Sequence, residues 1–180
     1  MANNDWDPRA QAQDFEQRTK AHVGSIEIPS ASQLIHQVRW YLQNMTNKGR
    51  TKSGVHMLKQ KVNQYGDTQI EAGPTFHKQG AKDCVVFQSG AELSFGITIH
   101  EEDRKSSLLA YRFHLELLPQ SGLDFVRIDL NMPNDNYDPL DQPRSHMHPG
   151  VEGMHFPFPP MHPIAVLDRI FHVIEPGLTP

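Results

Sequence analysis

Residues 143–163 read PRSHMHPGVEGMHFPFPPMHP and hold four histidines, His146, His148, His155 and His162. Imidazole can exchange a proton near neutral pH and is also the commonest protein ligand of metal ions. The six prolines of this stretch exclude a long helix or a central strand, because proline has no backbone N–H to donate. We therefore expect a loop that presents histidines for proton transfer or for metal binding.

The H-x-H spacing of His146 and His148 suits a metal site. Alternate side chains of an extended segment point to the same side, so both imidazoles can approach one ion. Zinc, iron, manganese and nickel all accept histidine ligands in this arrangement. Further ligands could come from His155, His162, Glu152 or Asp129. One hypothesis is therefore a metal-dependent enzyme, or a metal-binding protein, that uses this pair.

A second hypothesis needs no metal. One neutral and one protonated histidine, with a cation beside them, can deprotonate a 2′-hydroxyl and protonate the leaving oxygen of a phosphodiester. His146 or His148, together with His114, would transfer the protons. The substrate would be held by Arg112, Arg127, Arg144 and Asn131. The protein would then be a ribonuclease-like hydrolase of RNA or of a nucleotide.

A third hypothesis gives the histidines no chemistry. Histidines among prolines and aromatic residues often fill space and hydrogen-bond to loop carbonyls, and prolines stiffen such a segment. His155 and His162 lie in this setting, so a structural role is favoured for these two. The protein would then be a non-catalytic interaction module that binds a protein partner through its N-terminal arm or its proline-rich loop.

Four strands are expected to position these side chains. Hydrophobic residues alternate with polar ones in residues 84–88, 92–100, 108–117 and 124–131. The connections between these segments are short, which favours an antiparallel meander. Residues such as Phe95 and Phe113 should face the core. The opposite face then carries the polar set Arg112, His114, Arg127, Asp129 and Asn131.

We expect helices before the first of these strands in the sequence and after the last one. Ser30 and Gln33 form a capping-box pattern, and an apolar stripe follows it as far as Met45. A second, shorter helix is expected within residues 55–65. Pro163 suits the first turn of a C-terminal helix, 163–175, and Pro176 would lie past its end.

The expected fold class is α+β, with a four-stranded antiparallel meander packed against an N-terminal helix pair and a C-terminal helix. Residues 1–29 are expected to be a polar arm and residues 30–180 a single domain. Within this domain we expect a helical part at 30–65, a sheet at 84–131, a histidine- and proline-rich loop at 132–162 and the C-terminal helix at 163–175.

Composition narrows the class of protein. The net charge of −4 does not favour tracking along nucleic acid, so a small RNA site or a nucleotide fits better than long DNA. The single cysteine, Cys84, excludes an intramolecular disulfide and a cysteine-based zinc site. The first 20 residues do not resemble a signal peptide, and no apolar run is long enough to span a membrane. We therefore expect a cytoplasmic protein that does not bind membranes.

The order of features in the C-terminal half resembles the small toxin proteins of the TumE type. A strand carries Arg127, Asp129 and Asn131, a loop follows with His146 and His148, and a helix closes the chain. The resemblance covers roughly the last 90 residues. It implies a toxin-like or defence-associated protein that pairs with an antitoxin-like partner and acts on RNA or in translation control.

Overall fold

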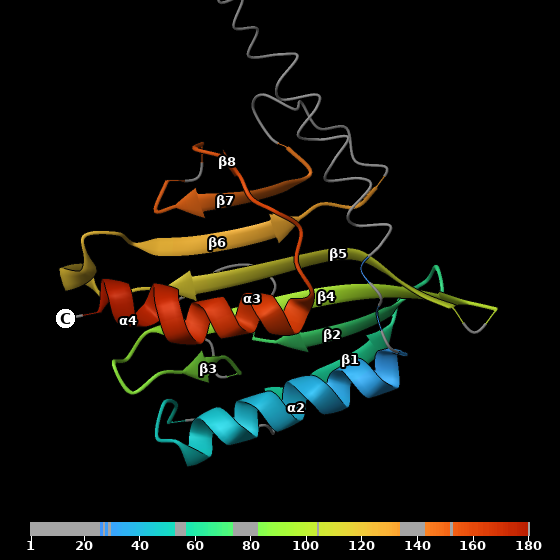
Figure 1. Cartoon of the computed structure of the whole chain (residues 1–180), viewed down its shortest axis with the longest axis horizontal. Helices are drawn as coiled ribbons and strands as arrows, with labels where there is room; N and C mark the ends of the chain where they lie inside the picture. The colour runs from blue at the N-terminus through green and yellow to red at the C-terminus, as the bar shows by residue number, and fades with distance from the viewer. Residues whose placement is uncertain are drawn as a thin grey trace, which may run out of the picture.

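The computed structural model describes residues 26, 28, 30–52, 57–73, 83–103, 105–133, 143–151 and 153–179. Its main feature is an eight-stranded antiparallel sheet in the order β1-β2-β4-β5-β6-β7-β8, with β3 paired to β4 (Figure 1). The strands are β1 (Lys59–Val62), β2 (Thr68–Ala72), β3 (Val85–Val86), β4 (Glu92–Glu102), β5 (Lys105–Glu116), β6 (Phe125–Leu130), β7 (Ser145–Pro149) and β8 (Phe156–Pro157). A 3-10 turn, η2 (Pro119–Ser121), lies between β5 and β6.

The expectation of a four-stranded sheet with an N-terminal helix pair is wrong. Residues 59–62 form β1, not part of a second helix, and β1 pairs with β2 to add a hairpin at one side. Asn63 favours a turn over a helix at this point. Its Oδ1 accepts from the backbone N–H groups of Tyr65 and Asp67 and so closes the turn between β1 and β2. At the other side, β7 and β8 lie within the stretch expected to be a loop, with Pro149 at a strand end and Pro157 in an edge strand.

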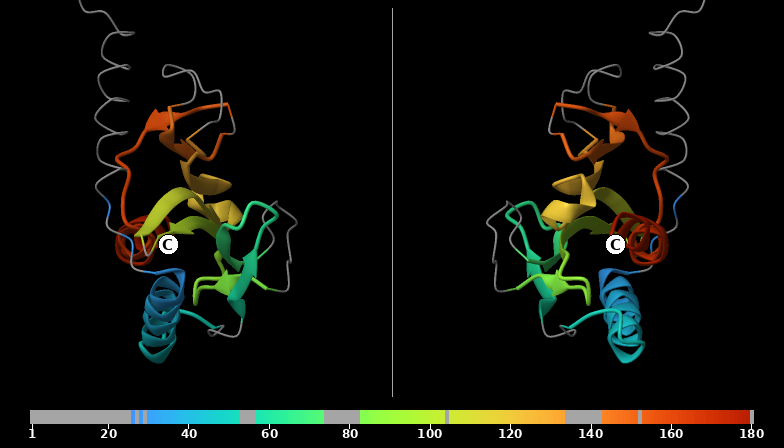
Figure 2. Two further views of the ribbon diagram at one scale, coloured as in Figure 1. Left: turned by 90° about the vertical axis from the view of Figure 1, so that its right-hand side faces the viewer. Right: turned by 90° about the vertical axis from the view of Figure 1, so that its left-hand side faces the viewer.

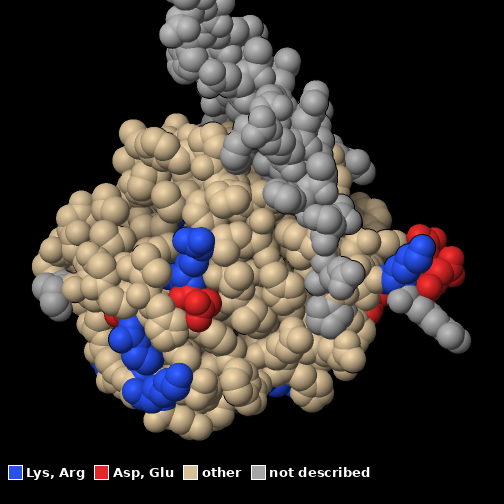
Figure 3. Space-filling view, viewed as in Figure 1, with Lys and Arg blue, Asp and Glu red and all other residues tan. Residues whose placement is uncertain are grey.

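All the described helices lie on one face of the sheet. Helix α2 (Ala31–Asn47) and the C-terminal helical segment, α3 (Pro163–Arg169), η3 (Ile170–Ile174) and α4 (Glu175–Leu178), pack side by side there (Figures 1 and 2). The predicted cap is observed, because Oγ of Ser30 accepts from the N–H of Gln33. On the side seen in Figure 1, few charged side chains interrupt the described surface (Figure 3).

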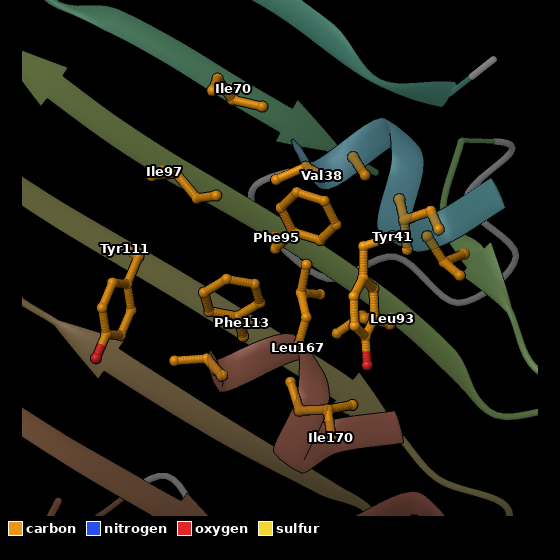
Figure 4. Close-up of a cluster of buried hydrophobic side chains, with 14 of the residues drawn as sticks. Val38, Tyr41, Ile70, Leu93, Phe95, Ile97, Tyr111, Phe113, Leu167 and Ile170 are labelled. Atoms are coloured by element: carbon orange, nitrogen blue, oxygen red, sulfur yellow. The ribbon is translucent and has the colours of Figure 1, made fainter. Parts of the chain in front are cut away.

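The core lies between these helices and the sheet. Side chains of β4 and β5 alternate as expected, with Phe95, Ile97 and Phe113 buried. Val38 of α2 and Leu167 of α3 pack onto them (Figure 4). Burial of this apolar face drives the sheet and helices together. The opposite face of the same strands is therefore left to polar side chains.

The C-terminal helical segment continues to Leu178, so Pro176 lies inside it and not past its end. The segment contains one π-helical turn, in which the N–H of Glu175 bonds to the carbonyl of Ile170. The next hydrogen bond of the same five-residue spacing would run from the N–H of residue 176 to the carbonyl of Phe171. Residue 176 is proline, which has no N–H, so this bond cannot form. Nη2 of Arg50 donates to that carbonyl at 2.6 Å and lies 3.3 Å from Oε2 of Glu175. Arg50 thus replaces the missing helical donor.

Arg50→Met is expected to lower the free energy of unfolding by about 2 kcal/mol. The change leaves the Phe171 carbonyl without this donor and removes the cation beside buried Glu175. Urea unfolding measures the difference. Arg39→Met, at an exposed position of α2, is the matched control and should change stability by less than about 0.5 kcal/mol. Equal effects of the two substitutions would contradict this role of Arg50.

The β1–β2 turn is tied to β4 by a pair of titrating groups. Nδ1 of His100 lies 2.8 Å from Oδ1 of buried Asp67. The hydrogen bond to Asp67 raises the pKa of His100, and the hydrogen bond to His100 lowers the pKa of Asp67. The pair is therefore ionic in weakly acidic solution and stabilises the turn there.

The difference in melting temperature between the wild type and His100→Gln is expected to depend on pH. Because the pKa of His100 is raised in the folded state, its stabilisation is fully present below the unfolded pKa of about 6.5. It is lost as the pH rises through the folded pKa. Thermal unfolding of both proteins from about pH 5 to about pH 9 measures this difference, and a difference that stays constant across the range would contradict the assignment.

Candidate metal centre

Two adjacent rows of polar residues cross the face of the sheet that lies away from the helices. The first row comprises Arg112, Asp129 and His146, and the second comprises His114, Arg127 and His148. Within each row the residues are register partners on β5, β6 and β7. The rows are neighbours because residues two apart on one strand point to the same face. The polar face expected from the alternation in β5 and β6 therefore continues into β7.

Asp129 is the acidic centre of this face and is only 1% exposed. Its Oδ1 accepts from Nε of Arg112 at 3.2 Å, and its Oδ2 accepts from Nε of Arg127 at 2.8 Å. Burial raises the pKa of Asp129, but the charges of Arg112 and Arg127, which both donate to this carboxylate, outweigh it. The pKa is held well below its usual range, so the carboxylate is charged throughout the neutral range.

His146 has one ring nitrogen held and the other directed into the interior of the site. Nδ1 lies 2.5 Å from the carbonyl oxygen of Pro143, which only accepts, so Nδ1 carries the proton. In the neutral form of this imidazole, Nε2 then has a lone pair. This atom is buried and makes no hydrogen bond to any described residue, with Oδ2 of Asp129 3.5 Å away. A backbone carbonyl on the far ring nitrogen is the usual way that proteins orient a metal-binding histidine.

His148 and His155 complete a group of three imidazoles. Nε2 of His148 lies 2.7 Å from Nη2 of Arg127, and a guanidinium only donates, so this nitrogen accepts from Arg127 with its lone pair. His155 follows the turn between β7 and β8 and is partly buried. Its ring centroid lies 4.3 Å from that of His148 and 5.0 Å from that of His146.

This three-histidine group could hold a metal ion. One ligand atom from each of His146, His148 and His155 lies within 4.8 Å of the others. Zinc–nitrogen bonds of 2.0–2.1 Å imply about 3.3 Å between neighbouring ligands of a tetrahedral site. The three rings would have to move closer together to bind an ion, and His148 would have to exchange its contact with Arg127 for the ion or present its other ring nitrogen. Three protein ligands leave one position of such a site open, as in catalytic zinc sites.

The remaining residues expected in the site are Arg144, His114, Glu152 and Asn131. Arg144 is buried and donates to the backbone carbonyls of Asn131, directly after β6, and of Leu109, within β5. His114 is buried and stacks on Phe125, with ring centroids 5.0 Å apart. Glu152 lies outside the described residues. Asn131, directly after β6, lines a surface depression beside Asp129.

His155 and His162, for which the sequence favours a structural role, have different roles in the structure. Nδ1 of His162 accepts from the N–H of Ile164 and caps α3, which is structural, and burial lowers the pKa of this imidazole. His155 instead joins the three-histidine group. The turn that returns it beside β7 contains Gly150 with φ of 77°, directly after Pro149. This Pro-Gly pair was the available sequence signal for a hairpin.

The fold and the site together define an α+β protein with its described helices on one face of an antiparallel sheet and a three-histidine group, two members of which are buried, on the other. Comparison of the chain with known protein families, with curated proteins and with solved structures found no match. Within the described ranges, no helix is both long enough and apolar enough to cross a membrane. The geometry of the site is therefore the basis for a functional proposal.

Proposed function

We propose that the protein binds one divalent transition-metal ion through His146, His148 and His155 and acts as a metal-dependent enzyme. The observation that carries this proposal is Nε2 of His146, which is buried, oriented by Pro143 and without a hydrogen bond to any described residue. A buried polar atom without a partner costs free energy. A metal ion coordinated by this lone pair would remove that cost.

The chemistry of the group favours zinc among the divalent ions. Three neutral imidazoles are acceptable ligands for zinc, iron, manganese and nickel. A set of three histidines with an open fourth position is an established arrangement for catalytic zinc, which lowers the pKa of its bound water. In this chain, Asp129 supplies negative charge beside the imidazoles, and Arg112 and Arg127 hold that carboxylate in place.

Elemental analysis of untagged protein, loaded with zinc and then dialysed, tests the proposal. We expect about one zinc per wild-type chain, none in His146→Ala, and an undiminished content in His36→Ala. His36 is exposed on α2, far along the chain from the site, and serves as the matched control. Circular dichroism checks that each variant is folded. Wild-type protein without stoichiometric zinc, or a folded His146→Ala variant that keeps it, would refute the proposal.

Hydrolysis of RNA or nucleotide phosphodiesters by histidine acid–base chemistry remains a second proposal, together with the toxin-like role and the protein partner that it implies. Its support is that Arg112, Arg127 and His114 share one face with His146 and His148. The side chains of His146 and His148 are 0% exposed, which favours an ion over a polymer as their occupant. RNA cleavage that resists a chelator and disappears in His148→Ala would instead favour this second proposal.

A further inference from the structure

The guanidinium of Arg127 contacts two groups of the candidate metal centre at once. Its Nη2 donates to Nε2 of His148 at 2.7 Å, and its Nε donates to Oδ2 of Asp129 at 2.8 Å. The side chain of Arg127 is 11% exposed, and those of Asp129 and His148 are almost fully buried. Hydrogen bonds and charge pairs are stronger in such a buried setting than in water. Arg127 is therefore firmly held between the carboxylate and the imidazole.

The two atoms that accept from Arg127 are also atoms that a metal ion would use. Oδ2 of Asp129 lies 3.5 Å from Nε2 of His148 and 3.5 Å from Nε2 of His146. Because both ring nitrogens approach the same carboxylate oxygen, an ion shared by the two histidines is reached most directly through their Nε2 atoms. Imidazole nitrogen and carboxylate oxygen are both zinc ligands. Arg127 thus holds two candidate ligand atoms, one from His148 and one from Asp129.

The charge of Arg127 also takes the part that an ion would play. One guanidinium supplies a positive charge to Asp129 and a donor to the lone pair of His148. A divalent ion at Nε2 of His148 would take the place of Nη2 and would repel the guanidinium across a short, buried distance. Nε2 of His146, by contrast, makes no hydrogen bond to any described residue. The ion and Arg127 therefore exclude each other at His148 and not at His146.

We infer that Arg127 is an internal competitor of the metal ion, which must release Nε2 of His148 before the ion can bind there. This inference rests on the proposed metal function and adds its regulation. The competition weakens metal binding, so the centre fills only above a concentration of the ion that Arg127 sets. Arg112 does not have this role to the same degree, because it contacts Oδ1 of Asp129 and 37% of its side chain is exposed.

Calorimetric titration of metal-depleted protein with zinc chloride tests the inference. Arg127→Met should bind zinc about tenfold or more tightly than the wild type, because a charge-assisted hydrogen bond no longer competes for His148. Arg112→Met is the matched control, since each variant loses one cation and leaves Asp129 one arginine. We expect this control to change the zinc affinity by less than about threefold, because exposed charges are screened. His146→Ala added to Arg127→Met should abolish binding.

Arg127→Lys replaces Arg127→Met if the latter does not fold, as judged by circular dichroism. Lysine keeps the positive charge, but a single ammonium does not reproduce the planar fork that reaches two acceptors. This variant should also bind zinc more tightly than the wild type.

The outcomes separate the competition from the metal function. Equal zinc affinities of the wild type and the Arg127 variant would overturn the inference and leave the metal function in place. One zinc bound by the Arg127 variant and none by the wild type would support the inference, and would show that the wild-type centre is too weak for the proposed function. No zinc in either protein would overturn both.

Discussion

Zinc at about a hundred times its dissociation constant is expected to raise the melting temperature by about 5–10 °C, and His155→Ala is expected to abolish this rise. An ion that binds only the folded chain adds about 2.7 kcal/mol of stability at that concentration, and each kcal/mol shifts the melting temperature of a chain of this size by about 2–4 °C. Differential scanning calorimetry with and without zinc measures the shift.

His155 is the informative ligand to remove. His146 and His148 are fully buried strand residues, so their truncation also disturbs packing. His155 is only partly buried, in the connection between β7 and β8, so the variant should retain most of its zinc-free stability. His36→Ala should keep the whole zinc-induced rise. A zinc-induced rise that survives in His155→Ala would place the ion elsewhere in the molecule.

The parts of the fold that could be predicted from sequence are those in which a local pattern decides the structure. Ser30 and the apolar stripe to Met45 specify α2 through capping and a 3.6-residue period. The alternation of β4, β5 and β6 reflects burial of one face against the helices. The edges of the sheet were missed because short strands such as Lys59–Val62 are exposed throughout and have no buried face to set a period.

Two of the three histidines of the candidate site and the charged residues beside them were predictable from sequence, but His155 and the arrangement of the group were not. Alternation placed Arg112, Arg127 and Asp129 on one face, and H-x-H spacing put His146 beside His148. Their meeting depends on the β6–β7 register, which pairs Asp129 with His146, and no local pattern specifies a register between strands joined by a long connection. Arg144 shows the limit of alternation, because it lies just before β7 begins and donates to backbone carbonyls instead.

Asp129→Asn is expected to lower the free energy of unfolding by about 3–5 kcal/mol in the absence of metal, the largest effect that we expect from a polar substitution in the described structure. The carboxylate neutralises the buried guanidinium of Arg127 and contacts that of Arg112. An uncharged amide leaves both cations without this counter-charge, and its NH₂ group would face N–H donors at one of the two oxygen positions.

The pH dependence of this loss follows from the low pKa of Asp129. A carboxylate with a depressed folded pKa contributes stability above its unfolded pKa of about 4, and the contribution disappears as the pH falls through the folded value. The free energies of unfolding of the wild type and of Asp129→Asn, measured with urea, should therefore show their full difference at neutral pH. The two values should become equal only in strong acid. Asp124→Asn, an exposed neighbour before β6, should match the wild type. A loss below about 1 kcal/mol at neutral pH would mean that the arginines find other partners, and that Asp129 does not organise the site.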